Sequence, residues 1–311
     1  CSIERIGGKY MIQSVKITNY LNESITLDMR FPEKSGFRIL EITGITPGKA
    51  TINIAESTTE DGGEYNSSHR GARNIIFYLG FDDSVSIETR RQTLYKYFPL
   101  QKKVRLEFIT ENRHCEIFGY VESNEPKVWA KTVTTPISIL CPNPYFYSVD
   151  TFLTIFYGVE SLFQFPFSNE SLTTKLLEFG SIQNKTTNVI NYTGDSEVGI
   201  FIEIHATDNA SGVKIYNLNT REIMEIDSAK LILLTGADIT IGDVIYISTV
   251  RGNKYIMLLR DGEYINILNT LNRRPKWFQL QKGDNMFAYT AEAGMSNLQF
   301  KITNRLVYEG L

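Results

Sequence analysis

The sequence predicts a mostly β protein with two domains. The chain has 311 residues, which is enough for two separate hydrophobic cores. It contains 17 Tyr and 18 Phe against 2 Trp, and Tyr and Phe favour strands. Short runs of alternating apolar and polar residues recur along the chain, and Gly, Asn and Asp separate them. Such runs at regular spacing are typical of β-sandwiches and β-barrels.

In the first half, alternation begins directly after Met11, so residues 1–10 are expected to lie outside the fold. The half closes at Pro142-Asn143-Pro144, the firmest break in the chain, because proline blocks both the sheet ladder and the helix. Between these points the pattern predicts strands over residues 15–27 (two strands joined by a turn), 37–42, 51–55, 73–81, 104–108, 115–121 and 137–141.

Two segments of the first half have a different pattern. Residues 56–71 are mostly polar and include Asp61-Gly62-Gly63, which predicts a long mobile loop. The segment before Pro99 favours a helix, because Ser84 or Ser86 can cap its start and Pro99 ends it.

The junction between the halves has an unusual composition. Residues 162–168 (Leu-Phe-Gln-Phe-Pro-Phe-Ser) are too aromatic for a solvated linker, and their proline excludes a central strand. Residues 191–195 then predict a turn that leads into the second half. There the pattern predicts strands at 200–204, 213–216, 231–234, 244–248, 255–259, 264–267, 277–280, 286–289 and 298–302, with a hairpin turn at 260–263.

The charge and cysteine content exclude several classes. The net charge is −3, whereas binding to nucleic-acid phosphates needs a concentrated basic face. The densest basic run, residues 101–105, is interpreted as the polar face of a strand. Cys1, Cys115 and Cys141 are odd in number and far apart, which predicts neither a disulfide framework nor a zinc site. No run approaches 18 apolar residues, so no membrane span is expected.

No catalytic constellation is present in the sequence, so we expect no enzyme, no cofactor and no metal site. The chain has no Gly-x-Ser-x-Gly elbow, no Gly-rich phosphate loop and no His-Glu-x-x-His. His69, His114 and His205 are isolated, with no carboxylate or second histidine at ligand spacing, and His205 is interpreted as a strand-end residue.

The acidic candidates are Glu122 with Glu125, Glu222 with Glu225, and Asp195, Asp208, Asp238 and Asp243. The two glutamate pairs could serve glycoside hydrolysis, but they lie beside turn residues, where solvated acids are the default. The four aspartates lie in turns without the acid spacing of a calcium loop. Trp129 and Trp277 could stack on a sugar if exposed, but a core or interface position is favoured for both.

An ordered set of short motifs covers most of the chain. It consists of Ile17-Thr18-Asn19-Tyr20, Asn22-Glu23-Ser24, Phe31-Pro32, residues 70–76, Tyr95-Lys96-Tyr97-Phe98-Pro99, Gly119-Tyr120-Val121-Glu122, residues 141–147, residues 163–167, Phe179-Gly180, residues 191–199, and Trp277-x-x-Leu280-x-x-Gly283-x-Asn285. Together these motifs resemble the siphovirus distal tail protein family, the hub protein of the phage baseplate. Asn143 departs from the family pattern, which often has Asp there.

The resemblance implies a fold and a structural role. Residues 11–147 would form an N-terminal β-sandwich-like or split-barrel-like domain with one helix, which assembles into a ring. Residues 148–170 would connect it to a galectin-like β-sandwich of residues 171–311. Six copies would cap the tail tube and leave a channel for the tape measure and DNA.

The implied partners are further copies in a homohexamer, the tail tube protein, a tail-tip or tail-associated lysin protein, and a receptor-binding protein, without specific nucleic-acid or membrane binding. The protein would be found in the virion, at the tail tip, after synthesis in the bacterial host cytoplasm. Residues 56–71 are expected to contact a subunit or the tube, because they have little core of their own.

Two other functions stay open. The second domain could be a saccharide-binding module that recognises a cell-wall glycan through exposed aromatics. A wall-degrading glycosidase would depend on Glu122 or Glu222. Unlike the larger members of the family that it resembles, the chain lacks room for an additional carbohydrate-binding insertion, which argues against direct host binding.

Overall fold

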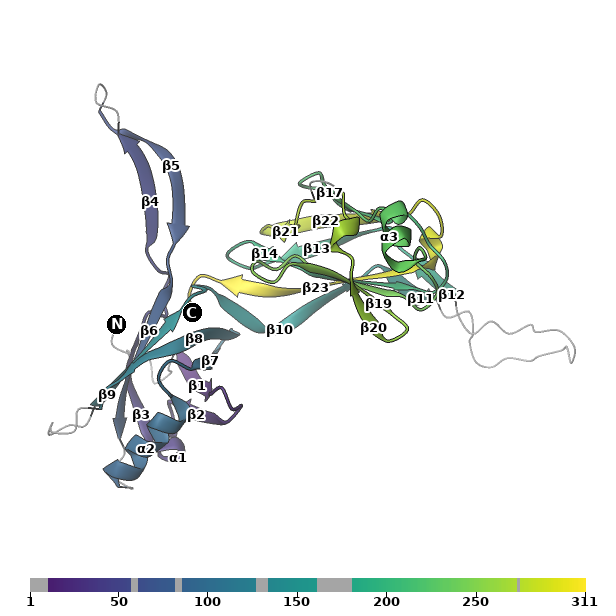
Figure 1. Ribbon diagram of the computed structural model, residues 1–311. Coiled ribbons are helices and arrows are strands. Elements are labelled where there is room, and N and C mark those ends of the chain that lie inside the picture. The colour runs from purple at the N-terminus through teal and green to yellow at the C-terminus, as the bar shows by residue number, and fades with distance from the viewer. Residues whose placement is uncertain (1–10, 57–60, 82–85, 127–133, 161–180, 273–274) are drawn as a thin grey trace, which may run out of the picture. The chain divides into compact units, whose positions relative to one another are not determined.

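The computed structural model describes residues 11–56, 61–81, 86–126, 134–160, 181–272 and 275–311 (Figure 1). The predicted mostly β class is confirmed. By its internal contacts the chain divides into unit 1, Cys1–Asp150 with Val307–Leu311, and unit 2, Thr151–Leu306. The last five residues therefore pack with the first unit, while the expected boundaries at residues 147 and 171 stay a prediction.

Unit 1 is organised around one antiparallel sheet. Its strands are β1 (Ile12–Thr18), β2 (Ser24–Asp28), β3 (Phe37–Thr43), β6 (Arg73–Phe81), β7 (Lys103–Thr110), β8 (His114–Asn124), β9 (Thr134–Cys141) and the start of β10 (Phe146–Ile155). They follow the order β2-β1-β7-β8-β9-β6-β3, and β10 pairs with the first residues of β8. Each strand expected from alternation is present, and the proline pair separates β9 from β10.

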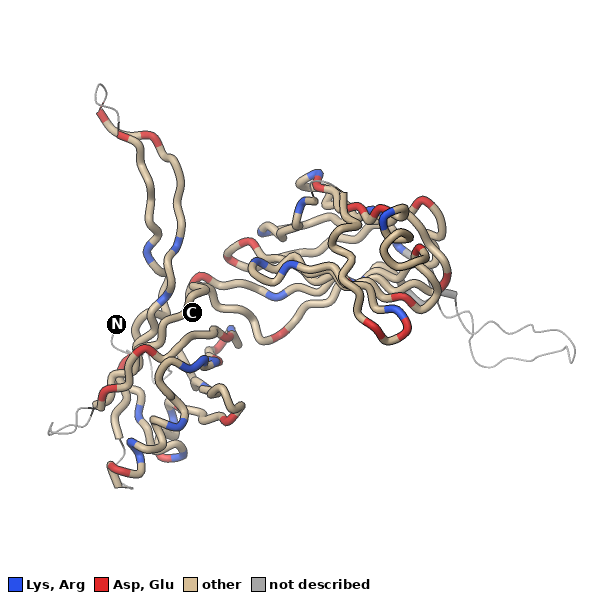
Figure 2. Tube along the Cα trace, in the orientation of Figure 1, with Lys and Arg blue, Asp and Glu red and all other residues tan. Residues whose placement is uncertain are grey.

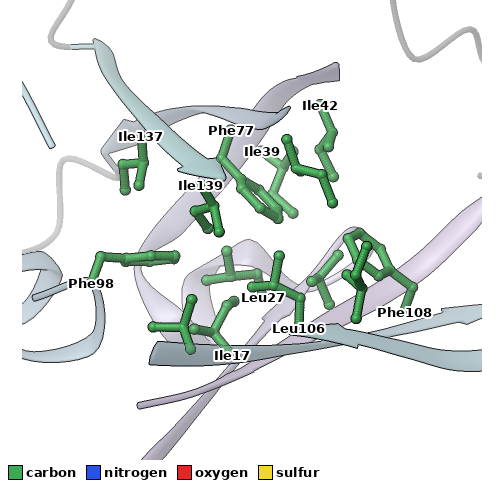
Figure 3. Close-up of a cluster of buried hydrophobic side chains, with 14 of the residues drawn as sticks. Ile17, Leu27, Ile39, Ile42, Phe77, Phe98, Leu106, Phe108, Ile137 and Ile139 are labelled. Carbon is green, nitrogen blue, oxygen red and sulfur yellow. The ribbon is translucent and has the colours of Figure 1, made fainter. Parts of the chain in front are cut away.

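The sheet of unit 1 encloses a single core. Figure 3 shows Phe77 of β6 and Ile139 of β9 facing Ile17 of β1 and Leu106 of β7, with Phe98 at the side. All of these side chains are buried. Burial of such side chains is the main driving force for folding, and it explains why the alternating pattern predicted these strands well.

The described residues of unit 1 include two helices. The expected helix is α2 (Ile87–Tyr97), although Ser86 at its start makes no capping hydrogen bond through its side chain. The four-residue α1 (Pro32–Ser35) adds a second helix to the one expected. Its local signals are Pro32 in the first turn and Gly36, which ends the helix with a left-handed φ of 75°.

The prediction of a mobile loop over residues 56–71 is wrong. Strand β4 (Ala50–Glu56) pairs in antiparallel fashion with β5 (Gly63–Arg70) to form a hairpin. Every residue of β4 is exposed, and so is every residue of β5 but the last. Because neither face of β5 packs on the core, its sequence was free to be polar, and the apolar alternation that marks most strands is missing.

The described residues of unit 2 form two large antiparallel sheets that share a core. The first sheet contains β15 (Phe201–Ala206), β18 (Val244–Ser248), β19 (Tyr255–Arg260), β20 (Glu263–Asn266) and β23 (Leu298–Tyr308), and the second contains β13 (Thr187–Tyr192), β16 (Lys214–Asn217), β17 (Glu222–Glu225) and β22 (Gly283–Thr290). Their orders are β23-β15-β18-β19-β20 and β13-β22-β16-β17. Tyr289 of β22 stacks on Phe300 of β23 with ring centroids 3.9 Å apart. This stack joins the two sheets, as in a β-sandwich.

Short elements complete unit 2. They are β11 (Tyr157–Glu160), β12 (Ser181–Asn184), β14 (Val198–Gly199), β21 (Gln279–Leu280), η1 (Leu268–Thr270) and η2 (Met295–Asn297). The turn expected between β19 and β20 is confirmed, since Asp261 and Gly262 have positive φ angles of 51° and 83°, as a type I′ turn requires. The turn expected at residues 191–195 begins later, because Asn191 and Tyr192 end β13. Residues 162–168 lie outside the described residues.

Residues 231–234 form part of a helix, so the strand predicted there is wrong. Helix α3 (Ser228–Thr235) starts after Asp227, whose carboxylate accepts a hydrogen bond from the Lys230 amide at 3.2 Å. It ends at Gly236, which has a φ of 83°. A short apolar run suits either a strand or a helix, and here the cap residues decide.

The end of α3 is held by a buried ion pair. The Arg260 guanidinium binds the Asp243 carboxylate at 2.5 Å and also donates to the Asp238 carbonyl and the Thr235 hydroxyl. Burial alone would raise the pKa of Asp243, but the hydrogen bonds from Arg260 and the Thr240 amide outweigh it and lower the pKa. The pair therefore fastens the 238–243 turn to the last turn of the helix.

We predict that Asp243→Asn destabilises unit 2 in a pH-dependent way. The pKa of Asp243 is lower in the folded state than in the unfolded state. The carboxylate therefore contributes its full stabilisation at pH values above the unfolded-state pKa, and this stabilisation is lost as the pH falls through the folded-state pKa. At pH 6 the substitution should lower the free energy of unfolding by about 3 kcal/mol, because it breaks a buried pair. At pH 2 this loss should be much smaller. Urea unfolding at both pH values checks this, with Asp261→Asn in the exposed turn as a nearly neutral control. An equal cost at both pH values contradicts it.

Candidate assembly surfaces

Arg73, the first residue of β6, joins three segments of unit 1. Its buried guanidinium donates to the carbonyl oxygens of Gly44 (2.7 Å), Thr46 (2.8 Å), Pro144 (2.6 Å) and Glu309 (2.6 Å). Burial lowers the pKa of Arg73, yet a guanidinium stays charged in proteins. It therefore ties the chain after β3, the turn after β9 and the C-terminal tail to the point where the hairpin leaves the sheet.

The C-terminal tail is fastened to the same place by further contacts. The Glu309 carboxylate pairs with Arg70, the last residue of the hairpin, at 2.7 Å, and this hydrogen bond raises the pKa of Arg70. The Leu311 amide donates to the Ile45 carbonyl at 3.1 Å. The base of the hairpin is thus rigidly built, although the hairpin itself has no core.

Gly44 permits the close approach at this base. Its φ is 79°, and a Cβ placed there would lie 1.9 Å from the Asn74 carbonyl oxygen. Any other residue would push the chain away from β6, so the glycine is required on steric grounds.

The hairpin carries an unpartnered apolar face. Ile54 stands directly opposite Tyr65, and Ile52 lies two positions along β4 on the same face. These three side chains are 59% (Ile52), 58% (Ile54) and 63% (Tyr65) exposed. A two-stranded hairpin alone is marginal in water, so this long, exposed and partly apolar hairpin is suited to packing on another surface.

The hairpin also has a charge gradient, visible in Figure 2. Its tip carries Glu56, Asp61 and Glu64, whereas Lys49 and Arg70 lie at its base. A partner surface for the tip would therefore be basic or neutral.

Unit 1 offers a second apolar surface, the outward face of the sheet. Phe118 and Tyr120 of β8 and Leu140 of β9 are exposed there, and Tyr120 is directly paired with Leu140. Leu40 of β3 extends this face at the other edge. The hairpin face and this outward sheet face are two different surfaces of one unit.

The histidines and Trp277 lie on different segments of the chain. His69 is exposed on β5, and His205 is partly buried on β15. His114 was expected to be isolated, but its Nε2 atom lies 3.5 Å from the Glu107 carboxylate, because antiparallel pairing of β7 with β8 brings them together. Trp277 is partly exposed with Lys254 over its ring, while Trp129 lies outside the described residues.

Several of the acidic candidates make separate local contacts. Glu122 accepts a hydrogen bond from Ser138 at 2.8 Å, and Glu225 pairs with Lys214 at 3.0 Å. Asp208 and Asp238 each accept a hydrogen bond from the next backbone amide. Among the described residues, no three His, Cys, Asp or Glu side chains lie so as to hold a metal ion. The helices within the described ranges are too short or too polar to cross a membrane.

The two described cysteines are inert. Cys115 and Cys141 are free and buried, and burial raises the pKa of each thiol to about 12. A thiol with such a pKa is protonated at neutral pH and is a poor nucleophile.

No family model and no curated protein matches the sequence. The structure, however, is similar to the crystal structure of the Dit protein of SPP1, described as a paradigm of the hub adsorption apparatus in phages that infect Gram-positive bacteria. The TM-score is 0.63 at 12% identity, over 94% of this chain and 99% of that chain. Two structures of the phage P2 baseplate in its activated conformation match with TM-scores of 0.47 and 0.46 at 13% identity, over 94% of this chain and 97% of those chains.

The chain therefore has the fold of a phage hub protein. More particularly, it has the fold of the SPP1 Dit protein along nearly the whole of both chains. At the level of the fold, this confirms the resemblance to the distal tail protein family that the ordered motifs indicated.

We predict that Arg73→Met detaches the C-terminal tail and loosens the base of the hairpin. The substitution leaves four carbonyl oxygens without their donor, which should cost at least about 3 kcal/mol. Urea unfolding measures the cost, and hydrogen exchange should show faster exchange at the Leu311 amide. The matched control is Arg38→Met, at an exposed position of β3, which should change stability by less than about 0.5 kcal/mol. Equal effects of the two substitutions would contradict this role of Arg73.

Proposed function

We propose that this chain is a structural protein of a phage tail hub. The observation that carries the proposal is the fold, which is shared with the SPP1 hub protein over 94% of this chain. Fold alone does not dictate function, so the proposal also rests on the two apolar surfaces of unit 1. These surfaces are suited to assembly with other copies and other tail proteins.

The two surfaces favour a ring. If the hairpin of one copy packs on the outward sheet face of the next, each copy uses different surfaces as donor and acceptor. Such a contact is heterologous, and heterologous contacts close into rings when the rotation permits. The number of six copies comes from the resemblance to the distal tail protein family.

Packing on a neighbouring copy would also stabilise the hairpin. Full burial of an Ile or a similar apolar side chain contributes about 1.5 to 3 kcal/mol, and Ile52 and Ile54 have most of that area still exposed. Pairing of the free edges of β4 and β5 with a neighbour would further protect unpaired backbone groups.

In this proposal the ring lies at the distal end of the tail, in the virion, after synthesis in the host cytoplasm. It joins the tail tube protein to the tail-tip or lysin protein and leaves a channel for the tape measure and DNA. A net charge of −3 is compatible with a channel that does not bind the phosphates of DNA. The role is structural and not enzymatic, and it needs no cofactor.

We predict that native mass spectrometry of the full chain shows a species of six copies, and that negative-stain images show a ring with an open centre. The triple variant Ile52→Ser, Ile54→Ser, Tyr65→Ser should shift the species towards monomer by at least tenfold, because it removes the apolar face of the hairpin. It should still fold, since the three side chains are exposed.

The control removes apolar side chains of unit 2 that are even more exposed. Leu233 and Ile241 are 87% and 69% exposed, so Leu233→Ser with Ile241→Ser should leave the ring unchanged. A chain that stays monomeric at high concentration would overturn the ring. A ring that persists in the triple variant would show that the hairpin is not part of the interface between copies.

A further inference from the structure

The first sheet of unit 2 has an outward face whose composition is unusual for a solvated surface. Antiparallel register places Lys301, Glu203, Tyr246, Met257 and Asn266 side by side in one row across β23, β15, β18, β19 and β20. Tyr264 stands in the adjacent row, on the edge strand β20. In this row, two charged side chains are followed by an aromatic, an apolar and an amide side chain.

The aromatic part of this face is a pair of tyrosines. The rings of Tyr246 and Tyr264 approach to 6.2 Å between centroids at an interplanar angle of 40°, and they lean together over the intervening strand β19. Tyr264 is 64% exposed, so one ring of the pair is open to solvent. Tyrosine supplies an apolar ring with a polar hydroxyl, and it loses little conformational entropy on binding.

Polar groups are fixed beside the rings. Lys301 binds the Glu203 carboxylate at 2.7 Å, and this hydrogen bond raises the pKa of Lys301. Burial, and then the negative charge of Glu203, raise the pKa of Tyr246, so its hydroxyl stays protonated and can donate. Donors and acceptors of fixed position thus border an exposed aromatic ring.

We infer that this outward face binds a neutral saccharide. A pyranose ring has a face of C–H groups, which packs on the negative face of an aromatic ring, and a rim of hydroxyls, which pairs with carboxylate, ammonium and amide groups. The rings of Tyr264 and Tyr246 can pack on the C–H face of the sugar. The side chains of Glu203, Lys301 and Asn266 can form hydrogen bonds with its hydroxyls. The charges of Glu203 and Lys301 balance each other, so this row of side chains has no excess cation to attract a polyanion.

A protein partner suits a different part of unit 2. The most exposed apolar side chains there are Leu233 of α3 and Ile241 in the turn beyond it, and they lie outside this sheet. The saccharide inference is independent of ring formation, because none of its residues belongs to unit 1.

The test uses the full chain and an array of neutral and acidic oligosaccharides of bacterial surfaces. The strongest neutral binder is then titrated by calorimetry. Tyr264→Ala and Glu203→Gln should each weaken its binding at least tenfold. Tyr95→Ala is the matched control, because Tyr95 is a 45% exposed tyrosine on α2 of unit 1 and belongs to neither the hairpin nor the sheet, and it should leave the affinity unchanged.

Thermal unfolding shows whether Tyr264→Ala and Glu203→Gln keep the stability of the parent chain, and native mass spectrometry shows whether assembly is intact. The inference is overturned if no neutral saccharide binds, if binding survives Tyr264→Ala, or if only polyanions bind in a salt-dependent way. A ring that forms without saccharide binding would overturn this inference alone, whereas saccharide binding by a monomer would overturn only the proposed ring.

Discussion

The arrangement of unit 1 depends on one buried guanidinium. Arg73 presents its planar donors to four backbone carbonyl oxygens that come from three distant parts of the chain. Lysine could not replace it, because a single ammonium cannot reach four divergent acceptors. The hairpin leaves the sheet on either side of this contact, with Gly44 before β4 and Arg70 at the end of β5. A hairpin without a core of its own can hold a direction only if its base is fixed, and Arg73 with the tail residue Glu309 fixes it.

This construction explains how one chain can be stable and still present apolar surface. The buried side chains of the enclosed core stabilise unit 1, while the hairpin face contributes little to the fold of the single copy and leaves Ile52 and Ile54 available. Unit 2 is stabilised separately, by the stack of Tyr289 on Phe300 between its sheets and by the Arg260–Asp243 pair at α3. Assembly and saccharide binding are thus assigned to different units and can be tested apart.

Much of the fold could be predicted from the sequence, because most strands bury one face and therefore alternate. The strand over Arg73–Phe81 and the Asp261-Gly262 turn are clear examples. Among the predictions that failed, two have a clear physical reason. β5 is exposed on both faces and has no apolar period, and residues 231–234 are apolar at every position, so only Asp227 and Gly236 distinguish helix from strand. The candidate surfaces were harder to predict from the sequence than the strands. Residues 56–71 were expected to contact a neighbour, but the pairing of Ile54 with Tyr65 and the tyrosine pair of unit 2 depend on register, which sequence alone does not give.

The most direct test of the account is hydrogen exchange at the hairpin, measured on the full chain above and below the concentration at which it assembles. The account predicts that backbone amides of β4 and β5 gain strong protection on assembly, while amides of the buried strands β6 and β9 exchange equally slowly in both states. If the hairpin amides exchange as fast in the assembled species as in the single copy, the hairpin is not a contact between copies, and the central claim is contradicted.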